Sequence, residues 1–333
     1  MTSNQSHKAV VFGSISIDKI VNKYGVFSSV LGGSAAYALL ANKKNTCELV
    51  GVVGNDFQQK HFNLLSEHSI STNSLTKLDG NTFCWGGEYK HDFSSRETLY
   101  VDPGVSESYL PDLSKDSKNC PYLLLGNTAP HLQTELLNQM QNSPFILLDT
   151  FKLYIDIANK ELKALVKRVD LFCINFNEAR AISGMDGSNL RDMAKSILDL
   201  GPKSLIIKDG KNGSHFFDAQ NNFSITAFPV DKVVDTTGAG DAFLGGILMG
   251  KINGKNIFES MQMGAVTASF CIEGIGMDGL LKINDTEFKR RLDWMDANHT
   301  SWKLIILTLT WYSNIRRIIR MYYFKNFIAS AVL

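Results

Sequence analysis

Short apolar runs alternate with longer amphipathic stretches from about residue 8 to about residue 285 of this chain. Nearly continuous apolar strands are typical of a parallel sheet buried on both faces, and helices between the strands supply the cover. The sequence therefore predicts an α/β fold with a doubly wound, mainly parallel sheet. The predicted strands are Ala9–Phe12, Leu49–Val53, Tyr122–Leu125, Phe145–Leu148, Leu171–Ile174 and Leu205–Ile207. The predicted helices are Ser34–Ala41, Phe57–His68, Leu132–Gln141, Ile155–Lys167, Leu190–Leu200, Ala242–Lys251 and Ile257–Cys271.

Residues 75–105 break this alternation, because they are rich in aromatic and β-branched residues and in glycine, with no helical period. We expect antiparallel strands that project from the sheet as a small β lid, with an ordinary surface hairpin as the alternative. The main domain then covers residues 8–297 with the lid strands inserted, and residues 298–333 form a basic, apolar C-terminal tail. Between Asp18 and Gly32 the chain is short, which predicts little room for another lid hairpin.

Charge and cysteine usage exclude several classes of protein. The chain has 34 basic and 33 acidic residues, so its charge does not call for nucleic acid as a partner. Its five cysteines are scattered and never spaced as C-x-x-C, which argues against a disulfide framework or a structural zinc site and favours a cytoplasmic location. The N-terminus lacks a signal-peptide pattern. The apolar run Leu304–Tyr312 is too short for a membrane span, which needs about 20 residues.

The most informative string is DTTGAGDAF, residues 235–243, in which two glycines flank an alanine just before a predicted helix. Small residues let backbone N–H groups approach an anion, and a helix N-terminus adds unpaired donors and a partial positive charge. Such a cradle suits the charge on a transferring phosphoryl group. Asp241 opens this helix, where the dipole is expected to lower its pKa. The alternative is a glycine turn that Asp241 merely caps.

DTTGAGDAFLGG resembles the C-terminal signature of the ribokinase-like carbohydrate kinases, the PfkB family. The resemblance covers about residues 8–285 and includes GSISID, LGGSAAYALLA, NFNE and KDGKNG in the family's order. It implies a ribokinase-like fold and transfer of the γ-phosphoryl group of ATP to a hydroxymethyl group of a sugar or sugar-like acceptor. By this resemblance the catalytic residues are Asp241 as base and, as the anion hole, the backbone amides of Gly238, Ala239, Gly240 and Asp241.

The metal and the nucleotide are expected at the ends of the later strands. Asn175 and Glu178 follow a predicted strand, at the sheet edge where doubly wound folds bind ligands. Their spacing suits a hydrated Mg²⁺, and the resemblance implies a Mg²⁺–phosphate role, although the same pair could cap a helix. The resemblance also implies a nucleotide site and a nearby site for a monovalent cation such as K⁺. The nucleotide residues are Lys208, Gly210, Gly213 and Thr236, and the monovalent-cation residues are Asp235 and Thr237.

The acceptor is expected beside Asp18, where a carboxylate can accept hydrogen bonds from vicinal hydroxyl groups. The resemblance implies hydroxyl binding by Asp18 and by the glycine pair Gly32 and Gly33, which a tight strand-to-helix turn would also explain. Asn127 and Asp149 end two further strands and are expected as additional contacts. Tyr37 stands where ribokinases carry asparagine, so the resemblance does not imply ribose itself.

Other functions remain open at this point. An adenosine-type nucleoside kinase would share the fold, and the lid aromatics Phe83, Trp85 and Tyr89 could stack on a base or serve only in packing. Arg96 and Lys152 could meet an acidic or phosphorylated acceptor. A non-catalytic relative would be expected to lack the base or the glycine cradle, and both are present. A dehydrogenase or a P-loop kinase would need a glycine motif that the sequence lacks. Lid strands of related proteins often pair, so a homodimer is a further expectation.

Overall fold

The computed structural model describes residues 8–298 with the exception of residues 42–46, 69, 94 and 187–188. Apart from Asn298, the predicted C-terminal tail lies outside the described residues. A compact unit ends at Phe288 and contains all of the features discussed below. Residues 285–298 are helical.

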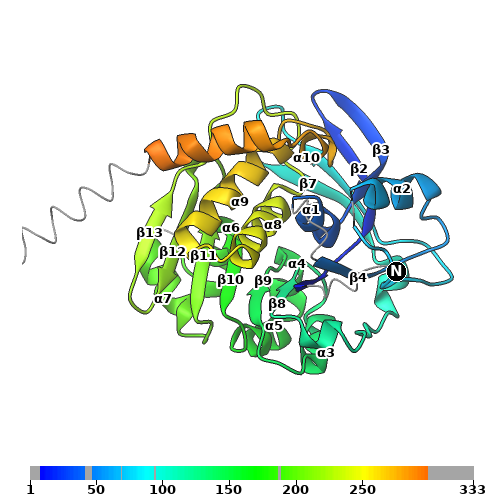
Figure 1. Ribbon diagram of the computed structural model, residues 1–333, viewed down its shortest axis with the longest axis horizontal. Helices are drawn as coiled ribbons and strands as arrows, with labels where there is room; N and C mark the ends of the chain where they lie inside the picture. Colours follow the sequence, from blue (N-terminus) through cyan, green and yellow to red (C-terminus); the bar gives the residue numbers. More distant parts are fainter. Residues whose placement is uncertain (1–7, 42–46, 69, 94, 187–188, 299–333) are drawn as a thin grey trace, which may run out of the picture. The chain divides into compact units, whose positions relative to one another are not determined.

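A nine-stranded sheet forms the centre of the described residues, in the order β13-β12-β11-β10-β9-β8-β1-β4-β5 (Figure 1). Neighbouring strands from β11 to β5 run parallel, whereas β12 and β13 are antiparallel. The expected doubly wound, mainly parallel sheet is therefore confirmed. The strands are β1 (Ala9–Phe12), β4 (Cys47–Val53), β5 (Leu75–Lys77), β8 (Tyr122–Leu125), β9 (Phe145–Leu148), β10 (Leu171–Asn175), β11 (Ser204–Lys208), β12 (Ser214–Asp218) and β13 (Asn222–Ile225).

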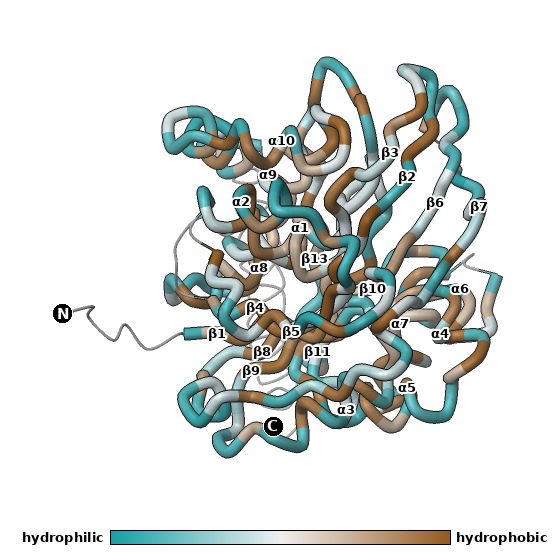
Figure 2. The backbone as a smooth tube through the Cα atoms, turned by 90° about the vertical axis from the view of Figure 1, so that its right-hand side faces the viewer, coloured by the Kyte–Doolittle hydropathy of each residue, from teal (hydrophilic) through white to brown (hydrophobic). Residues whose placement is uncertain are grey.

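Helices cover both faces of this sheet, as the buried strands require (Figure 2). On one face pack α1 (Ser34–Leu40), α8 (Ala239–Ile252) and α9 (Ile257–Cys271). On the other, a continuous apolar core joins the strands to α3 (Pro130–Gln139), α5 (Asn159–Val166), α6 (Phe176–Ser183) and α7 (Leu190–Leu198). The remaining helices are α2 (Gln59–Glu67), α4 (Lys152–Ile157), α10 (Asp278–Leu281) and the short 3-10 helices Gly104–Glu107, Ser117–Asn119 and Gly210–Asn212.

A second sheet forms the lid and has the strand order β3-β2-β6-β7, with bounds Gly25–Gly32, Ser16–Asn22, Cys84–Tyr89 and Arg96–Asp102. Figure 2 shows these four strands rising side by side from the main sheet. The prediction of a lid is confirmed for β6 and β7, but β5 belongs to the main sheet. The expectation of little room for another hairpin is wrong: β2 and β3 form one, because their turn uses only Lys23 and Tyr24.

Other predicted elements differ in detail from the observed ones. The helix expected over Ile155–Lys167 is two helices, α4 and α5, with Ala158 outside the helical region at φ −130° and ψ 33°. There the Asn159 side chain donates to the Ile155 carbonyl at 3.0 Å, which offers the backbone an alternative to the helix ladder. None of the helices in the described part of the chain combines the length and the apolar character that crossing a membrane requires.

Candidate active site

A cavity of about 410 Å³ lies where five parallel strands of the main sheet end. Ser14, Asn127, Asp149, Asn175 and Lys208 line it, each at or just after the carboxyl end of its strand. The first residues of α8 and the lid complete the wall. The site thus occupies the sheet edge at which doubly wound folds bind ligands.

Most of the residues selected from the sequence meet at this cavity. They are Asp18, Gly33, Asn127, Asp149, Asn175, Glu178, Lys208, Gly210, Thr236, Thr237, Gly238, Gly240 and Asp241. Asp235 is fully buried behind this wall. Gly213 is a turn residue at φ 96°, where a β-carbon would collide with the Ile225 carbonyl. Gly32 has no β-carbon, and this leaves space for the Asp18 carboxylate. Neither glycine lines the cavity, and neither does Ala239.

The start of α8 has the backbone geometry of an anion cradle. Gly238 caps the helix in the left-handed region at φ 73°, with the Tyr37 ring packed where a β-carbon would lie. A β-carbon at Gly240 would lie 3.1 Å from Lys208 Nζ, so a side chain here would press against that ammonium group. Amides in a first helical turn have no intrahelical partner. The Ala239 amide differs from the expectation, because it donates to the Thr236 carbonyl at 3.3 Å.

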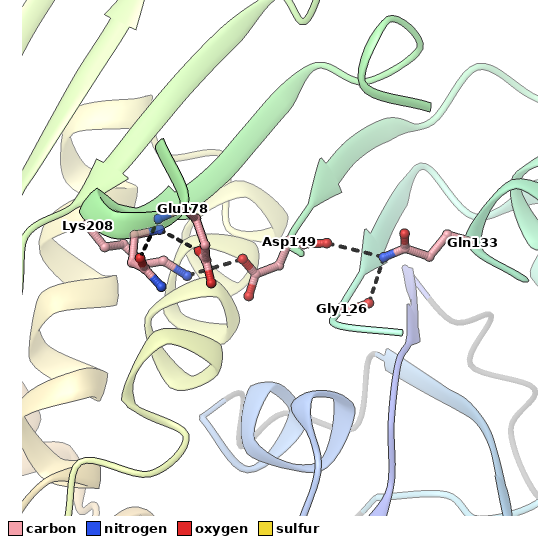
Figure 3. A network of polar contacts seen from close by, with 6 residues as sticks. Gly126, Gln133, Asp149, Glu178 and Lys208 are labelled. Carbon is pink, nitrogen blue, oxygen red and sulfur yellow. Dashed lines mark hydrogen bonds and ion pairs between the residues drawn. The ribbon is translucent and has the colours of Figure 1, made fainter. Parts of the chain in front are cut away.

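A buried ion pair crosses the floor of the cavity: Lys208 Nζ lies 3.3 Å from Asp149 Oδ1 (Figure 3). Gln133 fixes the neighbouring backbone by donating to the carbonyls of Asp149 and Gly126. Burial alone would lower the pKa of Lys208, but the carboxylates around it, Asp149 first, raise that pKa above its usual value. Lys208 therefore stays protonated.

Asn175 and Glu178 form a capping box at the start of α6. The Asn175 side chain accepts from the Glu178 amide at 2.9 Å, and the Glu178 carboxylate accepts from the Asn175 amide at 2.8 Å. The capping alternative is thus observed, and both side chains still line the cavity. Burial and the nearby Asp149 carboxylate raise the pKa of Glu178 to about 7.

Asp241 carries a raised pKa of about 7, which results first from burial and next from the charge of Asp149. The prediction that the helix dipole lowers this pKa is wrong. A helix N-terminus contributes at most about 1–2 kcal/mol, and here desolvation and a neighbouring carboxylate outweigh it. Asp241 is consequently a better proton acceptor than its sequence position suggests.

Four residues that line the cavity each carry a buried polar atom without a hydrogen-bond partner. These atoms are Asp18 Oδ1, Tyr37 Oη, Asn127 Oδ1 and Thr150 Oγ1. Buried polar atoms normally have partners, so this set is suited to a ligand with several hydroxyl groups. Asp18 and Asn127 were expected here. Tyr37 and Thr150 were missed, although Thr150 follows a predicted strand and Tyr37 stands at a position already singled out.

The lid touches the start of α8 through Tyr89, whose hydroxyl lies 2.7 Å from the Thr237 hydroxyl. Thr237 in turn donates to Asp235 from both its amide and its hydroxyl, at 2.9 and 2.7 Å. The other Asp235 oxygen accepts from the Gly276 amide at 2.9 Å. Lys152, by contrast, forms an exposed pair with Asp156 and does not line the cavity.

Comparisons with known proteins agree with this architecture. The family model described as pfkB family carbohydrate kinase matches residues 6–283. A cytidine kinase from Thermococcus kodakarensis is 28% identical over 265 residues, which cover 77% of this chain and 92% of the relative. A ribokinase from Lactococcus lactis is 26% identical and covers 87% of this chain and 99% of its own. The structure of a Burkholderia thailandensis nucleoside kinase in complex with inosine superposes with a TM-score of 0.72 at 19% identity, over 86% of this chain and 98% of that one.

Proposed function

The chain belongs to the pfkB family of carbohydrate kinases and is an ATP-dependent kinase of a sugar or a nucleoside, and from this premise we propose that it phosphorylates a hydroxymethyl group with Asp241 as the base. The observation that carries the proposal is the shared cavity. It joins the glycine-lined start of α8 and the Asp241 carboxylate to a group of unpartnered polar atoms that suits a hydroxylated acceptor.

In the proposed reaction the acceptor oxygen attacks the γ-phosphorus while the bond from that phosphorus to the β–γ bridging oxygen breaks. Asp241 accepts the hydroxyl proton, which a raised pKa favours. The amides at Gly240 and Asp241 stabilise the negative charge on the phosphoryl oxygens. Lys208 lies next to this cradle and adds a fixed positive charge.

The residues around Asn175 and Glu178 fit a Mg²⁺ ion that arrives with the nucleotide. Four carboxyl groups and two basic side chains line the cavity, and burial raises the pKa of all four carboxyl groups, so a bound cation would favour their charged forms. The described residues contain no group of three or more acidic, histidine or cysteine side chains arranged to hold a metal alone. Such a site suits Mg²⁺, which keeps several waters and takes few protein ligands besides phosphate. Once bound, the ion would neutralise charge on the phosphates.

A monovalent cation such as K⁺ is proposed near Asp235 and Thr237. The support is electrostatic: Asp235 is fully buried, and its hydrogen-bond partners are the neutral groups of Thr237 and Gly276. Among the described residues it forms no ion pair within 4.0 Å. A buried carboxylate in such surroundings favours a nearby cation.

A free sugar is the first candidate for the acceptor, and a nucleoside is the second. The unpartnered oxygen atoms suit the hydroxyl groups of either. The nucleoside is favoured by Phe83, which lines the same cavity and has a flat ring for a base, whereas the rings of Trp85 and Phe151 lie against the Arg96 guanidinium. The relatives named cytidine kinase and ribokinase match this choice.

Two further expectations are kept as proposals. A homodimer through the lid is supported by Leu99, Tyr100 and Val101, which are exposed apolar residues on the edge strand β7. A cytoplasmic location is supported by the scattered cysteines.

The test is ATP consumption across a library of free sugars and nucleosides, with wild type, Asp241→Asn and the control Asp199→Asn, an exposed residue that caps the C-terminus of α7. Wild type should turn over with a subset of acceptors, and Asp241→Asn should lose about three orders of magnitude in kcat while ATP still binds. Near-normal turnover of Asp241→Asn would exclude it as the base.

A further inference from the structure

Two groups of the proposed reaction come from different parts of the fold. Asp18, expected beside the acceptor, belongs to the lid strand β2, whereas the base Asp241 lies in the first turn of α8. Both line the cavity. Transfer requires the acceptor oxygen to lie within hydrogen-bond reach of the base, and a misplacement of about 1 Å can cost about 10²-fold in rate. The contact between the lid and the start of α8 therefore controls the geometry of the reaction.

Three side chains of the lid form hydrogen bonds to the segment that leads into α8, residues 233–237. Asn22 and Tyr24 donate to the main-chain carbonyls of its first two residues, at 3.2 and 3.4 Å. The third is Tyr89, the last residue of β6, whose hydroxyl lies 2.7 Å from that of Thr237. Of these three hydrogen bonds, that of Tyr89 is the buried one, and it is the closest in sequence to the anion cradle.

The direction of the Tyr89 hydrogen bond follows from the protons available. A hydroxyl group carries one proton, and Thr237 donates its own to Asp235 Oδ1 at 2.7 Å. Tyr89 therefore donates, and Thr237 Oγ1 accepts. The other Asp235 oxygen accepts from the Gly276 amide at 2.9 Å. Thr237 is thus held from two sides, immediately before Gly238, where the cradle begins.

Tyr89 is tightly packed but lies outside the cavity. It is buried, and its ring belongs to the small apolar core of the lid together with Ile20 and Trp85, against which Ile275 packs. It does not line the cavity, so it would touch neither the acceptor nor the nucleotide. Its cross-strand partner Arg96 is another polar neighbour of its hydroxyl. Any effect of this hydroxyl on the reaction must therefore pass through another residue.

We infer that Tyr89 is a positioning residue for phosphoryl transfer, whose hydrogen bond to Thr237 holds the start of α8 in register with the lid strand that carries Asp18. The inference rests on the proposed kinase function. The strand of Tyr89, β6, pairs directly with β2, so the link between the two parts is short. Tyr89 exchanges no proton with the substrates. It aligns the acceptor oxygen with the base and the phosphorus, and it should therefore affect kcat and not KM.

The first test compares Tyr89→Phe with Glu88→Gln, a change at the exposed preceding residue of the same strand. Tyr89→Phe keeps the ring in the apolar core and removes only the hydroxyl. Steady-state kinetics at constant KCl use whichever of ribose, fructose, cytidine and inosine supports ATP consumption. Tyr89→Phe should lower kcat about tenfold, the effect of a misplacement of less than about 1 Å, and leave both KM values within about threefold. Glu88→Gln should match wild type.

A double-mutant comparison identifies the residue through which Tyr89 acts. Thr237→Val keeps the shape of the side chain but cannot accept the hydrogen bond. If Tyr89 acts through Thr237, adding Tyr89→Phe to Thr237→Val should lower kcat by less than about twofold. The full tenfold loss in that background would overturn the inference, because it would assign the effect to Arg96.

A further measurement does not depend on turnover. Thermal stability is recorded with acceptor alone, with MgADP alone, and with MgADP, aluminium fluoride and acceptor, which together imitate the transferring group. The complete mixture should raise the Tm of wild type and Glu88→Gln beyond either ligand alone. Tyr89→Phe should keep the two separate increases and lose part of the additional one, and it should cause no further loss in Thr237→Val.

Three other results would overturn the inference while the kinase function stands. The first is an unchanged kcat in Tyr89→Phe, which would leave the hydroxyl a role in stability alone. The second is a raised acceptor KM at constant kcat, which would make Tyr89 part of the acceptor site. The third is a kcat that returns to the wild-type value at higher KCl, which would assign its effect to the cation site. Wild type that binds no MgATP and uses none of the acceptors would instead refute the proposed function and the inference with it.

Discussion

Replacing Lys208 with methionine should destabilise the fold more than replacing its partner Asp149 with asparagine. The two charges are 3.3 Å apart, and their side chains are only 15% and 7% exposed. Lys208→Met leaves Asp149 buried beside two other carboxylates, Glu178 and Asp241, whose charges reinforce the penalty. Removing one partner of such a pair costs about 3–5 kcal/mol.

Asp149→Asn leaves Lys208 near the same two carboxylates, which still compensate its charge. We therefore expect a cost of about 1–3 kcal/mol. In the double variant Asp149 no longer leaves a buried charge without its cation, although Glu178 and Asp241 still lose Lys208, so its cost should be less than the sum by about 1–2 kcal/mol. The measurement is urea unfolding of all three variants, with Lys195→Met as the control, since its pair with Asp199 is exposed and worth about 0–1 kcal/mol.

The stability lost in Lys208→Met should depend on pH in a direction that the pKa of Asp149 determines. Burial raises the pKa of Asp149 in the folded state, and removing Lys208 takes away the charge that opposes this rise. The folded Lys208→Met protein then binds a proton at Asp149 that the unfolded chain releases, so its loss of stability relative to wild type should become smaller as the pH falls. A larger cost for Asp149→Asn than for Lys208→Met, or a deficit independent of pH, would refute the reasoning.

Two further changes test the metal and the acceptor ends of the cavity. Glu178→Gln should raise the Mg²⁺ concentration needed for half-maximal activity about tenfold, while the hydrogen bond that caps α6 persists. An unchanged Mg²⁺ titration would argue against a metal role for Glu178. Tyr37→Phe should raise the acceptor KM about 3- to 30-fold with little effect on the ATP KM, because it removes a buried hydroxyl that has no protein partner. If the acceptor KM of Tyr37→Phe equals that of wild type, this hydroxyl does not contact the acceptor.

The sequence was sufficient for the main sheet and for most of the cavity because both depend on local patterns. Strands β1, β8 and β9 match the apolar runs residue by residue. The carboxyl ends of parallel strands must meet at one edge, so Asn127, Asp149 and Asn175 could be brought together without coordinates. The lid was harder, since β2 alternates between buried and half-buried positions, β3 is mostly exposed until its last two residues, and neither has the continuous apolar run of the central strands.

Properties that depend on several distant segments could not be predicted from the sequence. The pKa of Asp241 follows from its burial and from Asp149, which comes from a different strand, and no local rule contains that neighbour. The unpartnered hydroxyl of Tyr37 is likewise visible only when α1, the lid and the Gly238 turn are packed together. The sequence pattern thus predicts where a side chain lies along a helix or strand. The packing of distant segments decides whether that side chain is charged and whether its polar atoms have a hydrogen-bond partner.

The charged side chains of the cavity come from both the main sheet and the lid. Four carboxylates face two basic side chains, and one of those, Lys208, is already paired. A nucleotide brings further negative charge, which Mg²⁺ offsets only in part. The remaining cation, Arg96, is located on the lid and not on the main sheet. The lid forms part of the cavity wall, and a covered site keeps water from the phosphoryl group. Exclusion of water would favour transfer to the acceptor over hydrolysis of ATP.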